Sequence, residues 1–173
     1  MHYPVPMRAG IITALILLVT ASSAHARTQL RTQTGQIPQP YANWIDRSKV
    51  PTPPVRISVT DISDCPRFAG ACALLDPTNY RIGMHPSIQR FVLLHEVGHI
   101  FDHEVMDRKG RDEFASLVRP RRWDGELFAD AYASCARPTR AWIQNYGWNP
   151  HTKRHRKACG VIRAAYGRYK AHN

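Results

Sequence analysis

Alternating apolar and polar residues predict β-structure in the first part of the chain. The alternation over residues 55–60 is typical of a half-buried strand. Residues 72–75 and 80–84 flank the turn-forming sequence Asp-Pro-Thr-Asn at 76–79, and we expect them to pair as a hairpin. The preceding residues 27–54 are rich in Gln, Thr and Pro, and we expect them to form an extended lead-in.

A nearly continuous apolar segment, residues 91–101, predicts a buried helix. Ser87 can cap its start, and its end is expected near Val105. A second helix, with Asp124 as its cap, is expected over residues 126–133. Three polar residues interrupt the first helix. They need an explanation, because burying polar groups without partners is costly.

The remaining C-terminal sequence also predicts helices. The charged connection over residues 107–122 contains apolar positions that suit a short helix. Asn149-Pro150 is a strong start signal for a final helix, which has an apolar face and a basic surface. Strands followed by helices predict an α+β fold, and residues 55–173 are expected to form one domain.

The N-terminus has the pattern of a secretory signal peptide. Arg8 supplies a positive end, an apolar run follows from Gly10 to about Thr20, and a small-x-small cleavage sequence ends at Ala26. A run of about a dozen apolar residues is well short of the roughly 20 that span a bilayer. We therefore expect residues 1–26 to be removed on export, which leaves a secreted protein without an integral membrane segment.

The polar residues of the apolar helix belong to the sequence His95-Glu96-Val97-Gly98-His99. Positions four apart lie one turn above each other on a helix, so the two histidines can bind the same ion. Glu96 projects beside them, where it can polarise a metal-bound water. Metal binding explains why polar groups occur in so apolar a helix.

A catalytic zinc usually has three protein ligands and leaves a fourth position for water. Glu126 and Asp130 lie one turn apart on the second helix, where Ala129 and Ala133 are small enough for close approach to the first helix. We expect Glu126 to be the third ligand. Asp130 is expected to accept a hydrogen bond from the far nitrogen of a ligand histidine, which fixes its tautomer.

Three other residues compete for the role of third ligand. His103 follows His95 by two helical turns, but on a straight helix it has rotated away from the histidine pair. Asp102 and Asp107 remain open as ligands in a site that uses aspartate.

The sequence HEVGH, followed by a helix with E-x-x-A-D-x-x-A, resembles the gluzincin zinc metallopeptidases, particularly the small single-domain minigluzincins. The resemblance implies one zinc ion per chain, bound by His95, His99 and Glu126. It also implies that Asp130 supports a ligand and that Glu96 is the general base. The expected activity is hydrolysis of peptide or protein substrates by zinc-activated water.

The resemblance covers about residues 55–136 and implies a small zincin-like domain. In such domains a short sheet packs on the motif helix and a second helix supplies the third ligand. The edge strand of the sheet, here expected around residues 81–85, holds an extended substrate by main-chain pairing. The C-terminal helix is an addition without a counterpart in the family.

The oxyanion of the reaction needs a second stabiliser besides zinc. In related enzymes this residue is His or Tyr, and four residues of this chain are candidates: His85, Tyr132, Tyr146 and His151.

Four cysteines fit an oxidising compartment and allow three pairings. We favour Cys65–Cys72 and Cys135–Cys159, because the first pair flanks a short loop and the second would tie the Glu126 helix to the C-terminal helix. A zinc–cysteine site is not expected, since no two cysteines have the close spacing of thiolate sites.

The formal net charge of +11 favours anionic partners. Cell-wall polymers, lipid head groups, acidic proteins and nucleic acid all fit, because charge alone does not select among them. An alternative function is therefore a basic secreted protein that binds anionic polymers and carries a non-catalytic zinc. Glu96 argues against it, since a closed structural site has no use for a base.

Overall fold

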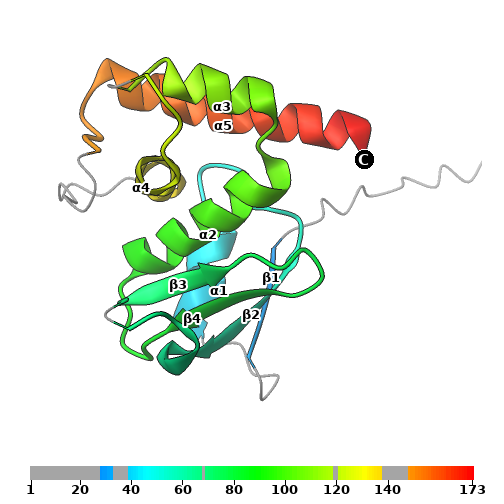
Figure 1. Ribbon diagram of the computed structural model, residues 1–173, viewed down its shortest axis with the longest axis vertical. Coiled ribbons are helices and arrows are strands. Elements are labelled where there is room, and N and C mark those ends of the chain that lie inside the picture. Colours follow the sequence, from blue (N-terminus) through cyan, green and yellow to red (C-terminus); the bar gives the residue numbers. More distant parts are fainter. Residues whose placement is uncertain (1–27, 33–38, 68, 119–120, 138–147) are drawn as a thin grey trace, which may run out of the picture.

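The computed structural model describes residues 28–32, 39–67, 69–118, 121–137 and 148–173. Within these ranges the chain forms a four-stranded sheet and five α-helices, so the fold is α+β, as the sequence predicts (Figure 1). The expected signal peptide lies outside the described residues.

The strand order of the sheet is β1-β2-β4-β3. β1 (Gln29–Thr32), β2 (Arg56–Asp61) and β4 (Tyr80–Met84) are parallel neighbours, and β3 (Ala71–Leu74) runs antiparallel to β4. The predicted hairpin is thus β3–β4, and the predicted alternating strand is β2.

The expectation that residues 81–85 form the edge of the sheet is wrong. β4 lies between β2 and β3, with Val59 of β2 opposite Ile82, so the edge strand beside α2 is β3. The difference arises because β2 and β4 pair in parallel across an intervening segment, and an alternating pattern does not reveal such a non-local partner.

Where it is described, the segment 27–54 is not an extended lead-in. It contributes β1 to the sheet and a helix, α1 (Gln39–Asp46), that packs against α2 (Arg90–Val105). Tyr41 and Ile45 lie one turn apart on α1 and are 6% and 4% exposed. This apolar pair anchors the helix in the core although the composition of the segment is largely polar.

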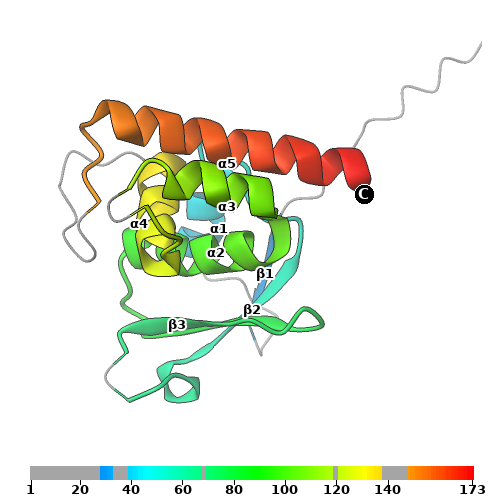
Figure 2. The same ribbon diagram turned by 45° about the horizontal axis from the view of Figure 1, so that its top comes forward.

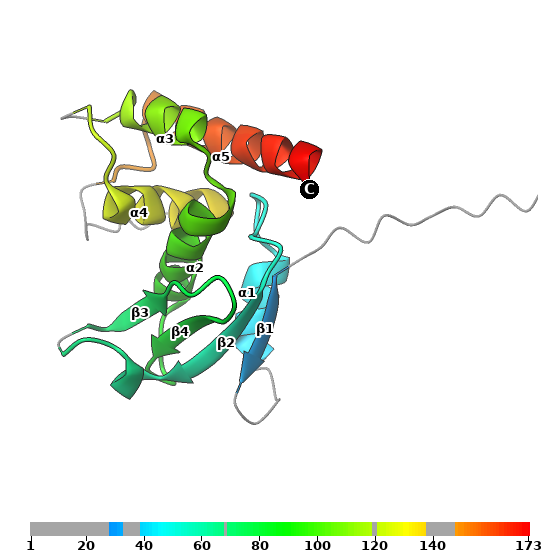
Figure 3. The same ribbon diagram turned by 45° about the vertical axis from the view of Figure 1, so that its right-hand side comes forward.

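Three more helices follow α2 in the chain: α3 (Arg108–Ala115), α4 (Gly125–Ala136) and α5 (Lys153–His172). Figures 2 and 3 show α2 between the sheet and the layer formed by α3 and α5, with α4 packed across α2. α2 is therefore covered on opposite sides by β-structure and by helix.

Side-chain caps start three of these helices. Asp107 accepts from the Gly110 N–H at the start of α3, and Asp124 accepts from the Leu127 N–H at the start of α4, as predicted. Thr152 caps α5, so this helix begins slightly later than the Asn149-Pro150 signal indicates. α2 begins at Arg90 without a side-chain cap, and Ser87 is not its N-cap.

Both expected cysteine pairs are bonded, Cys65 with Cys72 and Cys135 with Cys159. The first bond lies over β4, where a Cβ atom at Gly83 would be only 2.6 Å from Cys65 Sγ. Only glycine fits at this position of the strand. In the parts of the chain that the structure describes, no helix is long and apolar enough to cross a membrane.

Candidate metal centre

The histidine motif lies in the buried middle of α2. The neighbouring apolar side chains Leu94 and Val97 are at most 1% exposed, because the sheet and α4 cover opposite sides of the helix. His95 and Glu96 are themselves only 7% and 6% exposed. Polar groups at this depth require polar partners or an ion.

Three potential ligand atoms converge beside α2. His95 Nε2 lies 3.2 Å from His99 Nε2 and 3.1 Å from Glu126 Oε2 of α4. His99 Nε2 lies 3.5 Å from the same carboxylate oxygen. Ligands at the usual zinc bond lengths of about 2.0–2.1 Å lie about 3.3–3.4 Å apart in a tetrahedral site. The spacing of the three atoms therefore fits a zinc ligand set.

Asp130 lies behind His95, on the side away from Glu126. Its Oδ1 is 2.9 Å from His95 Nδ1, and the aspartate is 1% exposed. A carboxylate accepts, so we assign the His95 proton to Nδ1, which leaves a lone pair on Nε2. This lone pair then faces the Glu126 carboxylate at 3.1 Å. A cation between the two groups would turn a repulsive contact into coordination.

The surroundings of the two histidines favour positive charge at this point. Burial opposes protonation of His95, but the hydrogen bond with Asp130 and the nearby acidic groups outweigh it and raise its pKa. Burial and the neighbouring charge of His95 lower the pKa of His99. The acidic groups thus stabilise one cation here, either a proton or a metal ion.

Glu96 lies next to this cluster. Burial raises the pKa of its carboxyl to about 7, although the charge of His95 and a hydrogen bond from the Ala73 backbone lower it and the charge of Glu126 raises it. A carboxyl group with such a pKa can accept and release a proton near neutral pH.

A cavity of about 590 Å³ opens onto these side chains. Apart from His95, Glu96, His99 and Glu126, the residues that line it are small or apolar. They come from β3, the loop before it, Leu75 and the first turn of α2. The lining consists of Ala69, Gly70, Ala71, Cys72, Ala73, Leu75, Phe91, Val92, His95, Glu96, His99 and Glu126.

The edge strand β3 forms one wall of this cavity. One side of β3 pairs with β4, and within the described ranges no strand pairs with its other side. A sheet edge presents backbone N–H and C=O groups that can pair with another extended chain. The sheet edge expected around residues 81–85 is therefore the outer side of β3, which adjoins Glu96.

The structure does not bring the competing third ligands to the histidine pair. His103 Nδ1 lies 3.0 Å from a tyrosine hydroxyl of β4. Asp102 and Asp107 pair with arginines, with N–O distances of 2.9 and 2.6 Å. Of the acidic candidates, Glu126 alone has its carboxylate in contact with both motif histidines in the described part of the chain.

The candidate oxyanion stabilisers that are described lie elsewhere. Tyr132 is fully buried and donates to the Pro51 carbonyl, and neither His85 nor His151 lines the cavity. Tyr146 lies outside the described residues.

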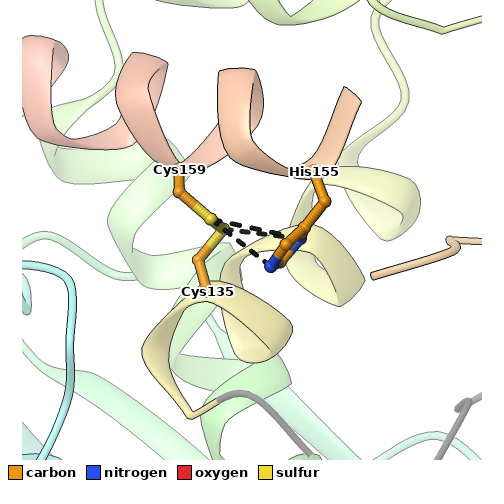
Figure 4. Close-up of side chains that lie close together, drawn as sticks. All are labelled: Cys135, His155 and Cys159. Atoms are coloured by element: carbon orange, nitrogen blue, oxygen red, sulfur yellow. Dashed lines mark hydrogen bonds between the residues drawn. A yellow bond between two sulfur atoms is a disulfide. The ribbon is translucent and has the colours of Figure 1, made fainter. Parts of the chain in front are cut away.

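A second group with metal-ligand chemistry consists of Cys135, His155 and Cys159, shown in Figure 4. The sequence-based expectations included the cysteines but not His155. One sequence feature could have identified this group. His155 and Cys159 are four residues apart on one helix, which is the same spacing as that of the two histidines of the motif.

No family model matches this chain, and neither the curated proteins nor the solved structures contain a match. The gluzincin resemblance therefore depends on the motif residues themselves.

Proposed function

We propose that this protein is an exported zinc metallopeptidase that resembles the gluzincins and has a zincin-like active-site arrangement. The observation that carries the proposal is the convergence of His95, His99 and Glu126 beside a buried carboxyl, Glu96, in one cavity. A closed structural zinc site has four protein ligands, whereas three ligands that open onto a cavity leave room for water and substrate.

His95, His99 and Glu126 would hold the zinc ion. When bound, the ion would act as a Lewis acid that lowers the pKa of a water molecule. Asp130 holds the His95 ring so that Nε2 faces the site. Glu96 accepts a proton from the attacking water at its carboxylate and later gives a proton to the leaving amine. The edge strand β3 binds the substrate backbone in extended form.

The walls of the cavity support a preference for small or apolar substrate side chains. Apart from the site residues, they contain alanine, glycine, leucine, valine, phenylalanine and a bonded cysteine, and no further charged group. A charged substrate side chain would lose hydration here without gaining a partner.

The two disulfides and the absence of a membrane-crossing helix from the described ranges are compatible with an extracytoplasmic location. Export through the N-terminal signal sequence is part of the proposal.

The metal content of the purified protein tests the proposed ligand set. We expect one zinc per chain in the wild type and in His103→Ala, because His103 faces a tyrosine hydroxyl and not the cluster. Glu126→Ala should lose zinc, since two histidines alone do not complete the site. Zinc retained in Glu126→Ala would contradict this assignment of the third ligand.

Glu96→Gln separates catalysis from metal binding. Glutamine keeps the size of the side chain but cannot take a proton, so hydrolysis of denatured casein should fall by about 10²–10⁴-fold while zinc content is unchanged. Cleavage at the wild-type rate would refute the general-base role. If the wild-type protein binds zinc but does not cleave casein, the peptidase proposal is refuted.

A second candidate function is binding of an anionic polymer through α5, which contains no Asp or Glu over its whole length. Such binding would be weakened by salt and would survive both Glu96→Gln and zinc removal. Heparin retention measured with and without a chelator distinguishes it from a zinc-dependent activity.

A further inference from the structure

A disulfide and an imidazole ring share a buried position between α4 and α5 (Figure 4). Cys135 near the end of α4 is bonded to Cys159 of α5, and His155 precedes Cys159 by one helical turn. These three residues are 2%, 8% and 9% exposed, in the order Cys135, Cys159 and His155. The ring is thus packed against the sulfur atoms within the core.

The nitrogen–sulfur distances are close to those of ligands on a shared metal ion. His155 Nδ1 lies 3.8 Å from Cys135 Sγ and 4.0 Å from Cys159 Sγ. With zinc bond lengths of about 2.3 Å to sulfur and 2.05 Å to nitrogen, tetrahedral ligands N and S are about 3.6 Å apart. To bind the ion, the two sulfurs would have to separate to about 3.8 Å, and the nitrogen–sulfur distances would have to shorten by about 0.2–0.4 Å.

We propose that Cys135, His155 and Cys159 form a second metal site, which binds a thiolate-preferring divalent ion when the Cys135–Cys159 disulfide is reduced. Reduction adds two electrons and two protons to the S–S bond and gives two thiols. With a phosphine as reductant, water supplies both protons and the oxygen of the phosphine oxide. Binding of the ion then releases both thiol protons and leaves two thiolates and one neutral imidazole as ligands.

Trp148 determines which ring nitrogen is available. Its indole N–H donates to His155 Nδ1 across 3.2 Å, so in the disulfide form Nδ1 carries a lone pair and Nε2 the proton. Nδ1 lies 3.8 and 4.0 Å from the two sulfurs, whereas the protonated Nε2 lies 3.6 Å from Cys159 Sγ alone. Metal binding would therefore displace the indole N–H without moving the proton on Nε2, and the fluorescence of Trp148 should report this change.

The site would preserve the connection between α4 and α5 when the disulfide is lost. α4 also carries Glu126 and Asp130, so its position affects the first metal centre. An ion held by residues of both helices can replace the covalent link in a reducing environment. This inference does not depend on the peptidase proposal, because it concerns different ligands.

Cobalt titration of the reduced protein tests the proposal. The protein is reduced anaerobically with a water-soluble phosphine and titrated with Co²⁺, which gives a thiolate-to-metal charge-transfer absorption only with sulfur ligands. We expect this absorption, with one more cobalt per chain than in the oxidised protein. His99→Ala should leave the absorption unchanged, since it affects only the first centre.

The second disulfide provides a matched control. The Cys65→Ser/Cys72→Ser variant should keep the absorption, because in the described residues that pair has no histidine grouped with it. His155→Ala retains both cysteines and should weaken cobalt binding at least tenfold, and the circular dichroism of its oxidised form verifies folding. Equal affinity in His155→Ala, no thiolate absorption in the reduced protein, or absorption that persists in concentrated urea would overturn the proposal.

Discussion

At the residue scale, Asp130 shows how one buried carboxylate can orient a candidate metal ligand. It is 1% exposed and lies 2.9 Å from His95 Nδ1, on the opposite side of the ring from the converging ligand atoms. Its charge stabilises the proton on Nδ1 and makes Nε2 a better donor to a cation. His95 is thereby held in one tautomer and one orientation.

Asp130→Asn should weaken zinc binding about 10–100-fold, because the amide can still accept a hydrogen bond but lacks the charge that increases the basicity of His95. Competition with a chromophoric chelator measures the affinity. Asp124→Asn is the matched control: it lies on the same helix, and asparagine caps a helix about as well as aspartate. Equal zinc affinity in both variants and the wild type would exclude the role of Asp130.

Asp107 links the start of α3 to α5. Hydrogen bonds from Arg168 lower the pKa of its carboxyl to about 2, with a smaller contribution from the Gly110 N–H and against the opposing effect of burial. The corresponding pKa in an unfolded chain is about 3.9. A pKa that folding lowers means that the ionised group stabilises the fold above about pH 4. This stabilisation is lost as the pH falls towards 2.

Asp107→Asn removes this charge while keeping a capping side chain. The variant should be less stable than the wild type by about 0.2–1 kcal/mol at neutral pH, which is the range for a solvent-exposed ion pair. Urea unfolding at several pH values should show that the difference disappears between about pH 4 and 2. Asp112→Asn, which changes an exposed and longer contact on the same helix, should show a smaller difference. A difference for Asp107→Asn that persists at pH 2 would contradict the ion-pair explanation.

The grouping of the candidate ligands in the first site was predictable because much of its geometry is local. The spacings of His95 with His99 and of Glu126 with Asp130 each follow from one helical turn. The approach of the two helices was inferred from small residues and family resemblance. His155 was not predicted, because its proximity to Cys135 depends on how α5 packs against α4.

At the element scale, the contact between α2 and α4 determines whether the proposed ligands meet. Gly98, inside the histidine motif, lies against α4 so closely that a Cβ atom there would be 2.9 Å from the Ala129 Cα. The close approach requires both the missing side chain at Gly98 and the small residue at Ala129. It allows the short Glu126 side chain to reach both histidines.

Gly98→Ala should therefore push α4 away from α2. Backbone atoms cannot yield as a flexible side chain can, so we expect a loss of about 1–3 kcal/mol in unfolding free energy together with weaker zinc binding. Urea unfolding and chelator competition measure the two effects.

The control is Gly160→Ala on α5, where an added Cβ would meet no atom within 4 Å other than those of its chain neighbours and the backbone of its own helix. There the better helix propensity of alanine should raise stability by about 0.5–1 kcal/mol. Gly98→Ala with wild-type zinc affinity would show that α4 tolerates displacement.

The elements that the sequence predicted correctly are those with local signals. The β3–β4 hairpin follows from its turn, and the cap of α4 follows from Asp124. β1 and α1 were not predicted, because they are short and lie in a polar, Pro-rich segment. The order of the parallel strands depends on contacts between distant parts of the chain, and so the edge strand was misassigned.

At the scale of the whole molecule, packing and one disulfide hold α2, α4 and α5 together. α4 packs on α2 through an apolar contact, and the Cys135–Cys159 bond ties it to α5. A metal ion at the proposed first centre would add a link, since two of the proposed ligands come from α2 and the third from α4. Metal occupancy should consequently influence the stability of the complete fold.

Chelation should lower the melting temperature of the wild-type protein. An ion present at 1,000 times its dissociation constant stabilises the folded state by about 4 kcal/mol. For a domain of this size that corresponds to a shift of roughly 10 °C. Differential scanning calorimetry with saturating zinc and with excess EDTA measures the shift. Glu126→Ala should melt at the same temperature in both conditions, because it lacks the third ligand. If EDTA leaves the wild-type melting temperature unchanged, or shifts Glu126→Ala equally, then the link between α2 and α4 does not involve a metal at these residues.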